Sequence, residues 1–515
     1  MKRTYTYTGL ILLSLVAFAA CNKDIIENNS DYTALEPKNL DINASGWKPL
    51  IITSADEFAL PIPESVSSES YKNELSSLKT VSANLTTEQK NIINYWKVGS
   101  VLRWNEIMRE LVAKHNLPPY QNPDGTYPIP SPANPFSYPE FPFSNPPYAA
   151  RAYAYVSAAQ YDALISAWHF KAKYNRPAPY KVDASVTVSI PKSELAAYPS
   201  EDAVVAGASF EMMKLLFPAD IEFITKKAQE EKNYRLWSGA NVMSDINAGD
   251  SLGRWVARKV IARAKTDGMG AAVGNPELWK KLETDCMAKG LTPWYSLELP
   301  KRPPMLPVYG NVKPMLFAPE AVATIRPDAP PAAGSPQMRK ELDEILNFTK
   351  NPTRERMRIV NFWADGVGTY TPPGHWNAIA TAEFVNHQYS EVRWARNYAL
   401  LNASMMDAAI ICWNTKYFYF NARPCQLDNR IKTLTGVPNF PAYISGHSTF
   451  SGAAETILSY LVPEKAKAFK AMADEASVSR MYGGIHYRAD CEQGLIAGEK
   501  VGSYAVNRAK VDGAN

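Results

Sequence analysis

The stretch RAYAYVSAAQYDALISAWHFK at residues 151–171 is repeated 245 positions later as RNYALLNASMMDAAIICWNTK at residues 396–416. Both copies keep Arg, Tyr, Asp, Trp and Lys at the same positions. The same shift pairs further distinctive residues downstream: Gly207 with Gly452, Pro218 with Pro463, Arg235 with Arg480, and Asp245 with Asp490. Chance does not hold one register over so many Trp, Pro, Gly and charged positions, so the chain contains an internal duplication.

The duplicated parts have the apolar spacing of α-helices. Apolar residues recur three and four positions apart over residues 151–170, 203–217, 450–461 and 491–505, on faces rich in Ala. No comparably long alternating pattern of a β-strand occurs. The sequence therefore predicts an all-α protein made of two tandem, duplicated helical bundles, joined by Pro-rich connecting segments.

The N-terminus has the features of an export signal. Lys2 and Arg3 precede an apolar run over residues 9–20, and Cys21 follows two small residues. This order is typical of a bacterial lipoprotein signal with Cys21 as the lipidated new N-terminus, and a plain secretory signal with an incidental Cys is the alternative. We expect a lipid-anchored protein of the bacterial cell envelope, periplasmic or on the outer-membrane surface, whose membrane contact is through the N-terminal lipid only.

Length and charge limit the other possibilities. A chain of 515 residues suits two domain-sized halves. A net charge of +4 is too close to neutral for a protein that binds nucleic acid through its phosphates, so no nucleic-acid partner is expected. The expected organisation in chain order is a signal peptide (1–20), a lipoprotein tether (21–60), a degenerate, structural first repeat (61–299), a Pro-rich linker (300–350) and a second repeat with the active site (351–515).

Two clusters in the second repeat are suited to binding an anion. Lys416 and Arg423 are seven residues apart, which places them two turns apart on one helix face. Ser445, Gly446 and His447 open an Ala-rich helix, and a helix N-terminus presents backbone N–H groups to an anion. The Ser hydroxyl and the imidazole add a further donor and a titratable group.

A third cluster completes the set with Arg480, His486 and Asp490. His486 and Asp490 are one helical turn apart, so the carboxylate can hold one ring nitrogen and direct the other. Three cations with amide donors provide the charge neutralisation and forked hydrogen bonds that a tetrahedral or trigonal-bipyramidal oxyanion needs. One imidazole can then bond to the central atom while the other moves protons.

The three clusters together, KxxxxxxRP, SGH and SRxxxxxHxxxD, resemble the signature of the type-2 phosphatidic acid phosphatase and vanadium-dependent haloperoxidase superfamily. The resemblance implies that His486 is the axial group, either the ligand of vanadium or the nucleophile that attacks phosphate. It implies that His447 is the acid/base residue. One departure is Ile444, where the family usually has Pro. The residues that would hold vanadate or phosphate are Lys416, Arg423, Ser445, Gly446, Arg480 and His486.

The first repeat lacks both imidazoles. At the same shift, Asp202 stands where His447 does and Asn241 where His486 does, while the equivalents of Lys416, Arg480 and Asp490 remain. Without an axial ligand or an acid/base group, we expect that copy to be structural.

Residues around the signature favour the haloperoxidase branch. The two bundles resemble the haloperoxidases, whereas soluble phosphatases of this type resemble a single bundle. Trp413 and Phe440 stand where the resemblance places halide-pocket aromatics, and Asp365 where it places a carboxylate that supports the acid/base His. His375 is a further candidate to line the cleft. Packing is the alternative role for Trp413 and Phe440, a turn for Asp365, and a solvated loop position for His375.

We therefore expect a vanadate-dependent haloperoxidase-like enzyme that oxidises halide with hydrogen peroxide. The alternative is a metal-independent acid phosphatase that hydrolyses a phosphoester through a phospho-histidine and needs no cofactor. A non-catalytic envelope lipoprotein with a vestigial site is a third possibility.

Overall fold

A computed structural model describes residues 32–117, 122–124, 142–299 and 301–514, and the described chain is helical. The first half contains α2 (Glu69–Ala83), α3 (Thr87–Trp96), α4 (Ser100–His115), α5 (Pro146–Tyr174), α6 (Pro179–Val182), α7 (Glu201–Leu216), α8 (Ile221–Trp237), α9 (Met243–Ala264) and α10 (Pro276–Ala288). The second half contains α11 (Val322–Ile325), α12 (Pro336–Lys350), α13 (Arg354–Phe362), α14 (Thr371–Phe384), α15 (Glu391–Tyr419), α16 (Pro424–Leu427), α17 (Gly446–Leu461), α18 (Ala466–Tyr482) and α19 (Arg488–Lys510). The prediction of an all-α fold is confirmed: within the described residues the extended pairing is limited to one isolated bridge.

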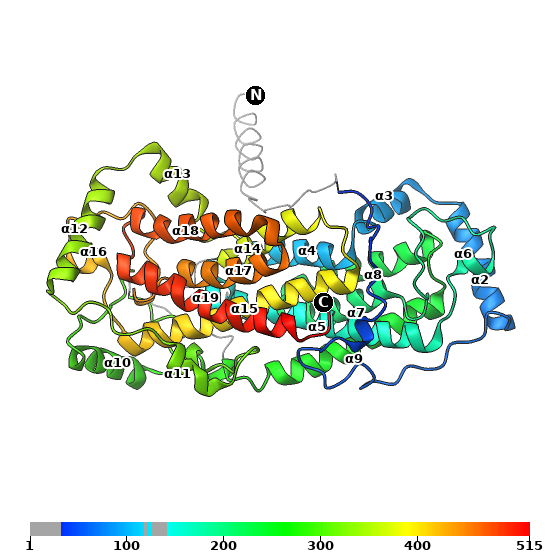
Figure 1. Cartoon of the computed structure of the whole chain (residues 1–515), viewed down its shortest axis with the longest axis horizontal. Helices are drawn as coiled ribbons and strands as arrows, with labels where there is room; N and C mark the ends of the chain where they lie inside the picture. Colours follow the sequence, from blue (N-terminus) through cyan, green and yellow to red (C-terminus); the bar gives the residue numbers. More distant parts are fainter. Residues whose placement is uncertain (1–31, 118–121, 125–141, 300, 515) are drawn as a thin grey trace, which may run out of the picture.

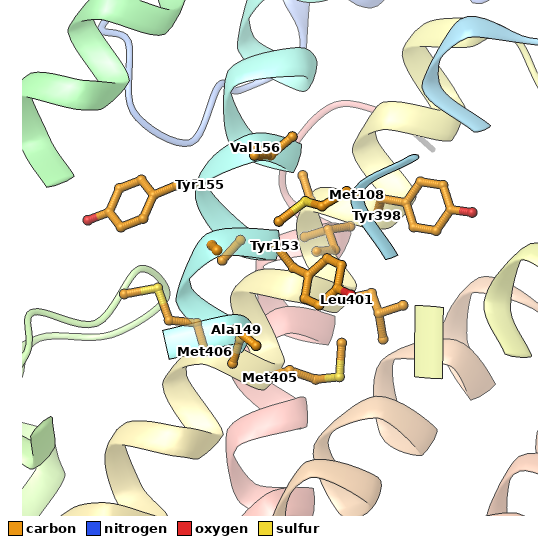
Figure 2. Close-up of a cluster of buried hydrophobic side chains, with 14 of the residues drawn as sticks. Met108, Ala149, Tyr153, Tyr155, Val156, Tyr398, Leu401, Met405 and Met406 are labelled. Atoms are coloured by element: carbon orange, nitrogen blue, oxygen red, sulfur yellow. The ribbon is translucent and has the colours of Figure 1, made fainter. Parts of the chain in front are cut away.

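The duplication predicted from the sequence is visible in the packing. Helices α5, α7, α8 and α9 correspond to α15, α17, α18 and α19, and α7 packs on α9 as α17 packs on α19. The long helices α5 and α15 pack against each other at the centre of the molecule (Figure 1). Figure 2 shows Tyr153 and Val156 of α5 among Leu401, Met405 and Met406 of α15, in one continuous apolar core. The two bundles therefore share a core.

Equivalent residues of the two repeats meet at this interface. The Asn402 side-chain amide donates to the Ser157 hydroxyl at 2.9 Å, and the two residues are 245 positions apart. The Asn105 amide likewise donates to Asn377 at 2.8 Å, and each of these two residues directly follows a Trp, so they are also equivalent. Equivalent positions can contact each other only close to a twofold axis, so the repeats are related by a pseudo-twofold rotation.

A buried Asp in each long helix fixes an extended segment. Asp162 accepts hydrogen bonds from the backbone N–H groups of Leu50, Ile51 and Ile52, at 2.7 to 3.0 Å. Its equivalent Asp407 accepts in the same way from backbone N–H groups of the segment after α10. Burial raises the pKa of Asp162 to about 6 and that of Asp407 to about 7.

Of the expected tether over residues 21–60, the structure describes residues 32–60. This part is polar, but it buries Trp47 and gives its backbone donors to Asp162, so it packs on the first bundle. Cys21 and the expected signal peptide lie outside the described residues. Within the part of the chain that the structure describes, no helix is long and apolar enough to cross a membrane.

Glycines bring the helices of each repeat into close contact. A Cβ on Gly253 would stand 2.1 Å from the Val204 carbonyl oxygen, and one on the equivalent Gly498 would stand 2.3 Å from that of Thr449. Both values are far below a normal contact, so a larger residue would push the helices apart. In the second repeat Gly494 lets α19 pass beside Ser445, whose backbone N–H donates to the Asp490 carbonyl at 2.9 Å. This contact fixes the start of α19 against the start of α17.

Candidate active site

The three clusters of the second repeat converge at one end of its bundle. Lys416 comes from the last turn of α15, Arg423 from the turn after it, Arg480 from the last turn of α18, and His486 from the turn before α19. They surround the N-terminus of α17, where the Ser445 hydroxyl caps the helix by accepting from the Ser448 N–H at 3.3 Å. A cavity of about 630 Å³ opens over this point, and Gly446, His447, Arg480 and His486 line it.

The three cations are buried without a counter-charge. Lys416 and Arg423 are fully buried, and Arg480 is 2% exposed. Their protein acceptors are mainly backbone carbonyls: Lys416 Nζ donates to Pro441 and Ala442, at 2.9 Å each. None of the three forms an ion pair with a carboxylate of the described residues. Burial lowers the pKa of Lys416 to about 7 and those of Arg423 and Arg480 to about 10. Such a site gains stability by binding an anion.

One ring nitrogen of His486 faces these cations, and the other contacts Asp490. Its Nδ1 lies 2.8 Å from Asp490 Oδ2, which also accepts from the Tyr487 N–H at 3.2 Å. Its Nε2 lies 3.1 Å from Arg423 Nη1, which donates to it. Burial, and then the charge of Arg423, hold the pKa of His486 well below its ordinary value. The ring is therefore neutral, with Nδ1–H held by Asp490 and the Nε2 lone pair facing the cations.

His447 lies at the second position of α17, on the cavity wall. Its Nε2 is 3.3 Å from Arg480 Nη1 and 3.6 Å from Asp365 Oδ2. Burial, and then the Arg480 charge, lower its pKa to about 4 against the smaller opposing effect of Asp365. The same nitrogen can accept from Arg480 when neutral and face Asp365 when protonated, so it is placed to take up a proton.

Asp365 links two imidazoles. Its Oδ1 lies 3.0 Å from His375 Nδ1 and its Oδ2 faces His447. Burial raises the pKa of Asp365, but its contacts with His375 and His447 outweigh burial and hold the pKa below its ordinary value. The ring of His375 stacks on Trp363 with centroids 4.6 Å apart.

His375 therefore differs from its expected place. It is 7% exposed, and it is not among the residues that line the cavity. It lies behind Asp365 because the first turn of α14 points inward, toward Trp363.

The two expected pocket aromatics do line the cavity. Trp413 and Phe440 pack with centroids 5.0 Å apart, and Lys416 Nζ lies 4.9 Å from the centre of the Phe440 ring. The Trp413 indole N–H donates to the Met305 carbonyl at 3.1 Å. An ammonium group over an aromatic face keeps its charge more readily than in an aliphatic pocket.

Part of the cavity wall is formed by residues that no sequence motif marks. Asn116, at the end of α4 in the first repeat, donates to the carbonyls of Gly366 and Thr369, at 2.8 and 2.9 Å. These bonds hold the loop that carries Asp365. Arg302 and Met305 of the Pro-rich linker complete the wall. These residues carry no motif, so only the fold identifies them.

One family profile and several solved structures are similar to this chain. The sequence profile of the PAP2 superfamily matches residues 397–509. The chain is similar to the structure of the first bacterial vanadium-dependent iodoperoxidase, with 24% identity and a TM-score of 0.56, over 71% of this chain and 91% of that one. The holo-type bacterial vanadium-dependent chloroperoxidase gives 13% identity and a TM-score of 0.51 over 74% and 96%. Its apo-type gives 12% and 0.51 over 71% and 94%. No curated protein matches the sequence. The fold expected from the motifs is confirmed, and the matched residues 397–509 contain all three motifs.

Proposed function

We propose that this protein is a vanadate-dependent haloperoxidase. The premise is that residues 397–509 are a PAP2 superfamily module in a chain with the vanadium-dependent peroxidase fold. The observation that carries the proposal is the set of three buried cations with no carboxylate partner, grouped around the Nε2 of a neutral His486. The activity is the oxidation of halide by hydrogen peroxide.

The residues present fit vanadate. Arg480 Nε is a buried donor that no described acceptor satisfies, as expected where a bound oxyanion would accept. Lys416, Arg423 and Arg480 would neutralise the charge of the anion, and the first N–H groups of α17 would donate to it. His486 Nε2 would be its single protein ligand, oriented by Asp490. Bound vanadate supplies an electrophilic centre that activates hydrogen peroxide toward halide.

The chain itself moves the proton. With a pKa of about 4, His447 is neutral at neutral pH, so its Nε2 can accept a proton from hydrogen peroxide entering the cavity. Asp365 lies 3.6 Å away and stabilises the imidazolium that forms. His375 holds Asp365 from behind, through the 3.0 Å contact at Nδ1. Trp413 and Phe440 provide a weakly polar wall beside the cations, where halide would approach.

The same residues support an acid phosphatase as the second candidate. His486 Nε2 would attack the phosphorus, and His447 would protonate the leaving oxygen. That second role requires His447 to carry a proton, and the pKa of about 4 leaves it mostly neutral at neutral pH. The low pKa of His447 therefore favours it as a base, which is the role that peroxide chemistry needs.

Two assays on the same purified protein test the proposal. Halide oxidation is measured with hydrogen peroxide after loading with orthovanadate, and phosphomonoester hydrolysis is measured without vanadate. We expect oxidation that depends on vanadate and is lost in His486→Ala, with phosphate as a competitive inhibitor. Phosphomonoester hydrolysis without halide oxidation would establish the phosphatase instead, and the absence of both activities would favour a non-catalytic role.

A further inference from the structure

The first repeat contains a second group of buried cations, at the positions equivalent to the active site. Lys171 corresponds to Lys416, and Arg235 corresponds to Arg480. Lys171 Nζ donates to the Ala196 carbonyl at 2.6 Å, as Lys416 Nζ donates to the equivalent carbonyl of Pro441. The frame that positions the cations has therefore been kept in both copies.

The two copies differ in what lies between the cations. Glu201 is the first residue of α7 and occupies the position of Gly446. Its carboxylate bridges the two cations, with Oε2 2.7 Å from Lys171 Nζ and Oε1 3.3 Å from Arg235 Nη2. Although burial raises the pKa of Glu201, Lys171 and Arg235 lower it to about 2, so the side chain is a carboxylate. Gly446 leaves the same space open.

Other contacts replace those of the axial imidazole in the first repeat. Where His486 stands in the second copy, the shorter Asn241 lets Arg176 reach Asp245 directly. The Asn241 amide oxygen also accepts from Arg235 Nε at 2.8 Å. The equivalent atom in the second copy, Arg480 Nε, is the buried donor without a described acceptor.

Only a small space remains above Glu201. The cavity that it lines with Asp202 and Arg235 measures about 70 Å³, against about 630 Å³ over the second copy. Leu35, Pro37 and Leu40 of the N-terminal segment form part of its wall. This volume holds water but no substrate-sized molecule.

We propose that the first repeat retains an oxyanion site in which the carboxylate of Glu201 takes the place of the external anion. The site would bind a tetrahedral dianion, such as phosphate or sulfate, between Lys171 and Arg235 once this carboxylate is removed. The first repeat is thus an anion-binding module that carries its own ligand: Glu201 neutralises Lys171 and shares Arg235 with Asp202, whose Oδ2 lies 2.8 Å from Arg235 Nη1.

The experiment is to replace Glu201 by the residue of the second copy, Glu201→Gly, and to count bound phosphate by equilibrium dialysis. We expect one more phosphate per chain than in the parent protein. We also expect a melting temperature that is lowered without phosphate and restored as phosphate is added. Arg235→Ala in the same chain should remove the added phosphate. Glu211→Gly, on the same helix, is the matched control, because Glu211 also pairs with cations but lies outside this group; it should add none.

A second variant guards against poor folding. Glu201→Ala also removes the carboxylate but places a good helix former at this position instead of Gly. An unchanged phosphate count with a melting temperature that does not depend on phosphate would overturn the proposal. So would unfolding of both variants at every phosphate concentration. Neither measurement depends on turnover, and each variant is compared with its own parent, so the result is separate from the fate of the proposed peroxidase activity.

Discussion

Binding of an oxyanion in the second repeat should be accompanied by uptake of a proton on Lys416. In the free protein this ammonium group is fully buried and forms no ion pair with a described carboxylate, and burial outweighs the smaller opposing effect of Asp490 and lowers its pKa to about 7 from 10.5. A bound dianion supplies the missing counter-charge and should return the pKa toward its ordinary value. That change corresponds to roughly 5 kcal/mol of attraction between anion and ammonium group. At pH 8.5 the free lysine is mostly neutral and the bound one charged, so ~1 proton is taken up, against ~0 at pH 5.5.

Titration calorimetry with sulfate, whose charge is constant over this range, measures the uptake in buffers of different ionisation enthalpy. Burial raises the pKa of Asp490 to about 7, so Asp490 titrates in the same range. The difference between the wild type and Lys416→Met therefore isolates the lysine. We expect a difference of ~1 proton at pH 8.5 that vanishes at pH 5.5. Equal proton uptake by both proteins at pH 8.5 would refute the reasoning that Lys416 is neutral in the free protein and gains a proton when the anion binds.

Four further outcomes are expected. The value of kcat/KM should fall below about pH 4, where His447 becomes protonated. Asp365→Asn should move this acid limb to lower pH, because the lost carboxylate stabilises the imidazolium. A shift to higher pH would contradict this. His375→Gln should lower kcat about ten- to hundredfold with KM for halide little changed, and an unchanged kcat would remove His375 from a role behind Asp365. Asp202→Ala should cost about 3–5 kcal/mol of stability by breaking a buried ion pair, measured by denaturant unfolding, with turnover within about tenfold of wild type. Cys21→Ala should move the protein from the detergent phase to the aqueous phase, and retention in the detergent phase would argue against lipidation.

The duplication and the cations could be predicted from the sequence because both depend on local spacing. One register of 245 positions revealed the two repeats, and Lys416, Arg423 and Arg480 stand at fixed distances from recognisable helix ends. The wall aromatics Trp413 and Phe440 are predicted from the family resemblance, which places pocket aromatics at these positions beside the motifs.

Long-range contacts account for what the sequence did not predict. Residues 32–60 are held by partners far along the chain: Asp162 accepts from residues 50–52, and Arg393 pairs with Asp41. The place of His375 behind Asp365 depends on its contacts with Asp365 and Trp363, which no local pattern encodes. Glu201 belongs to no sequence motif, and only the geometry shows its carboxylate between two buried cations.

Calorimetric titration of orthovanadate into His486→Ala and His447→Ala tests most directly whether the second repeat holds vanadate as described. His486 donates the ligand nitrogen, so His486→Ala should show no measurable binding. His447 lies beside Arg480 and moves a proton, so His447→Ala should keep its affinity within about tenfold of wild type, or ~1.4 kcal/mol, while turning over slowly. Loss of binding in His447→Ala with binding retained in His486→Ala would reverse the two roles and contradict the account.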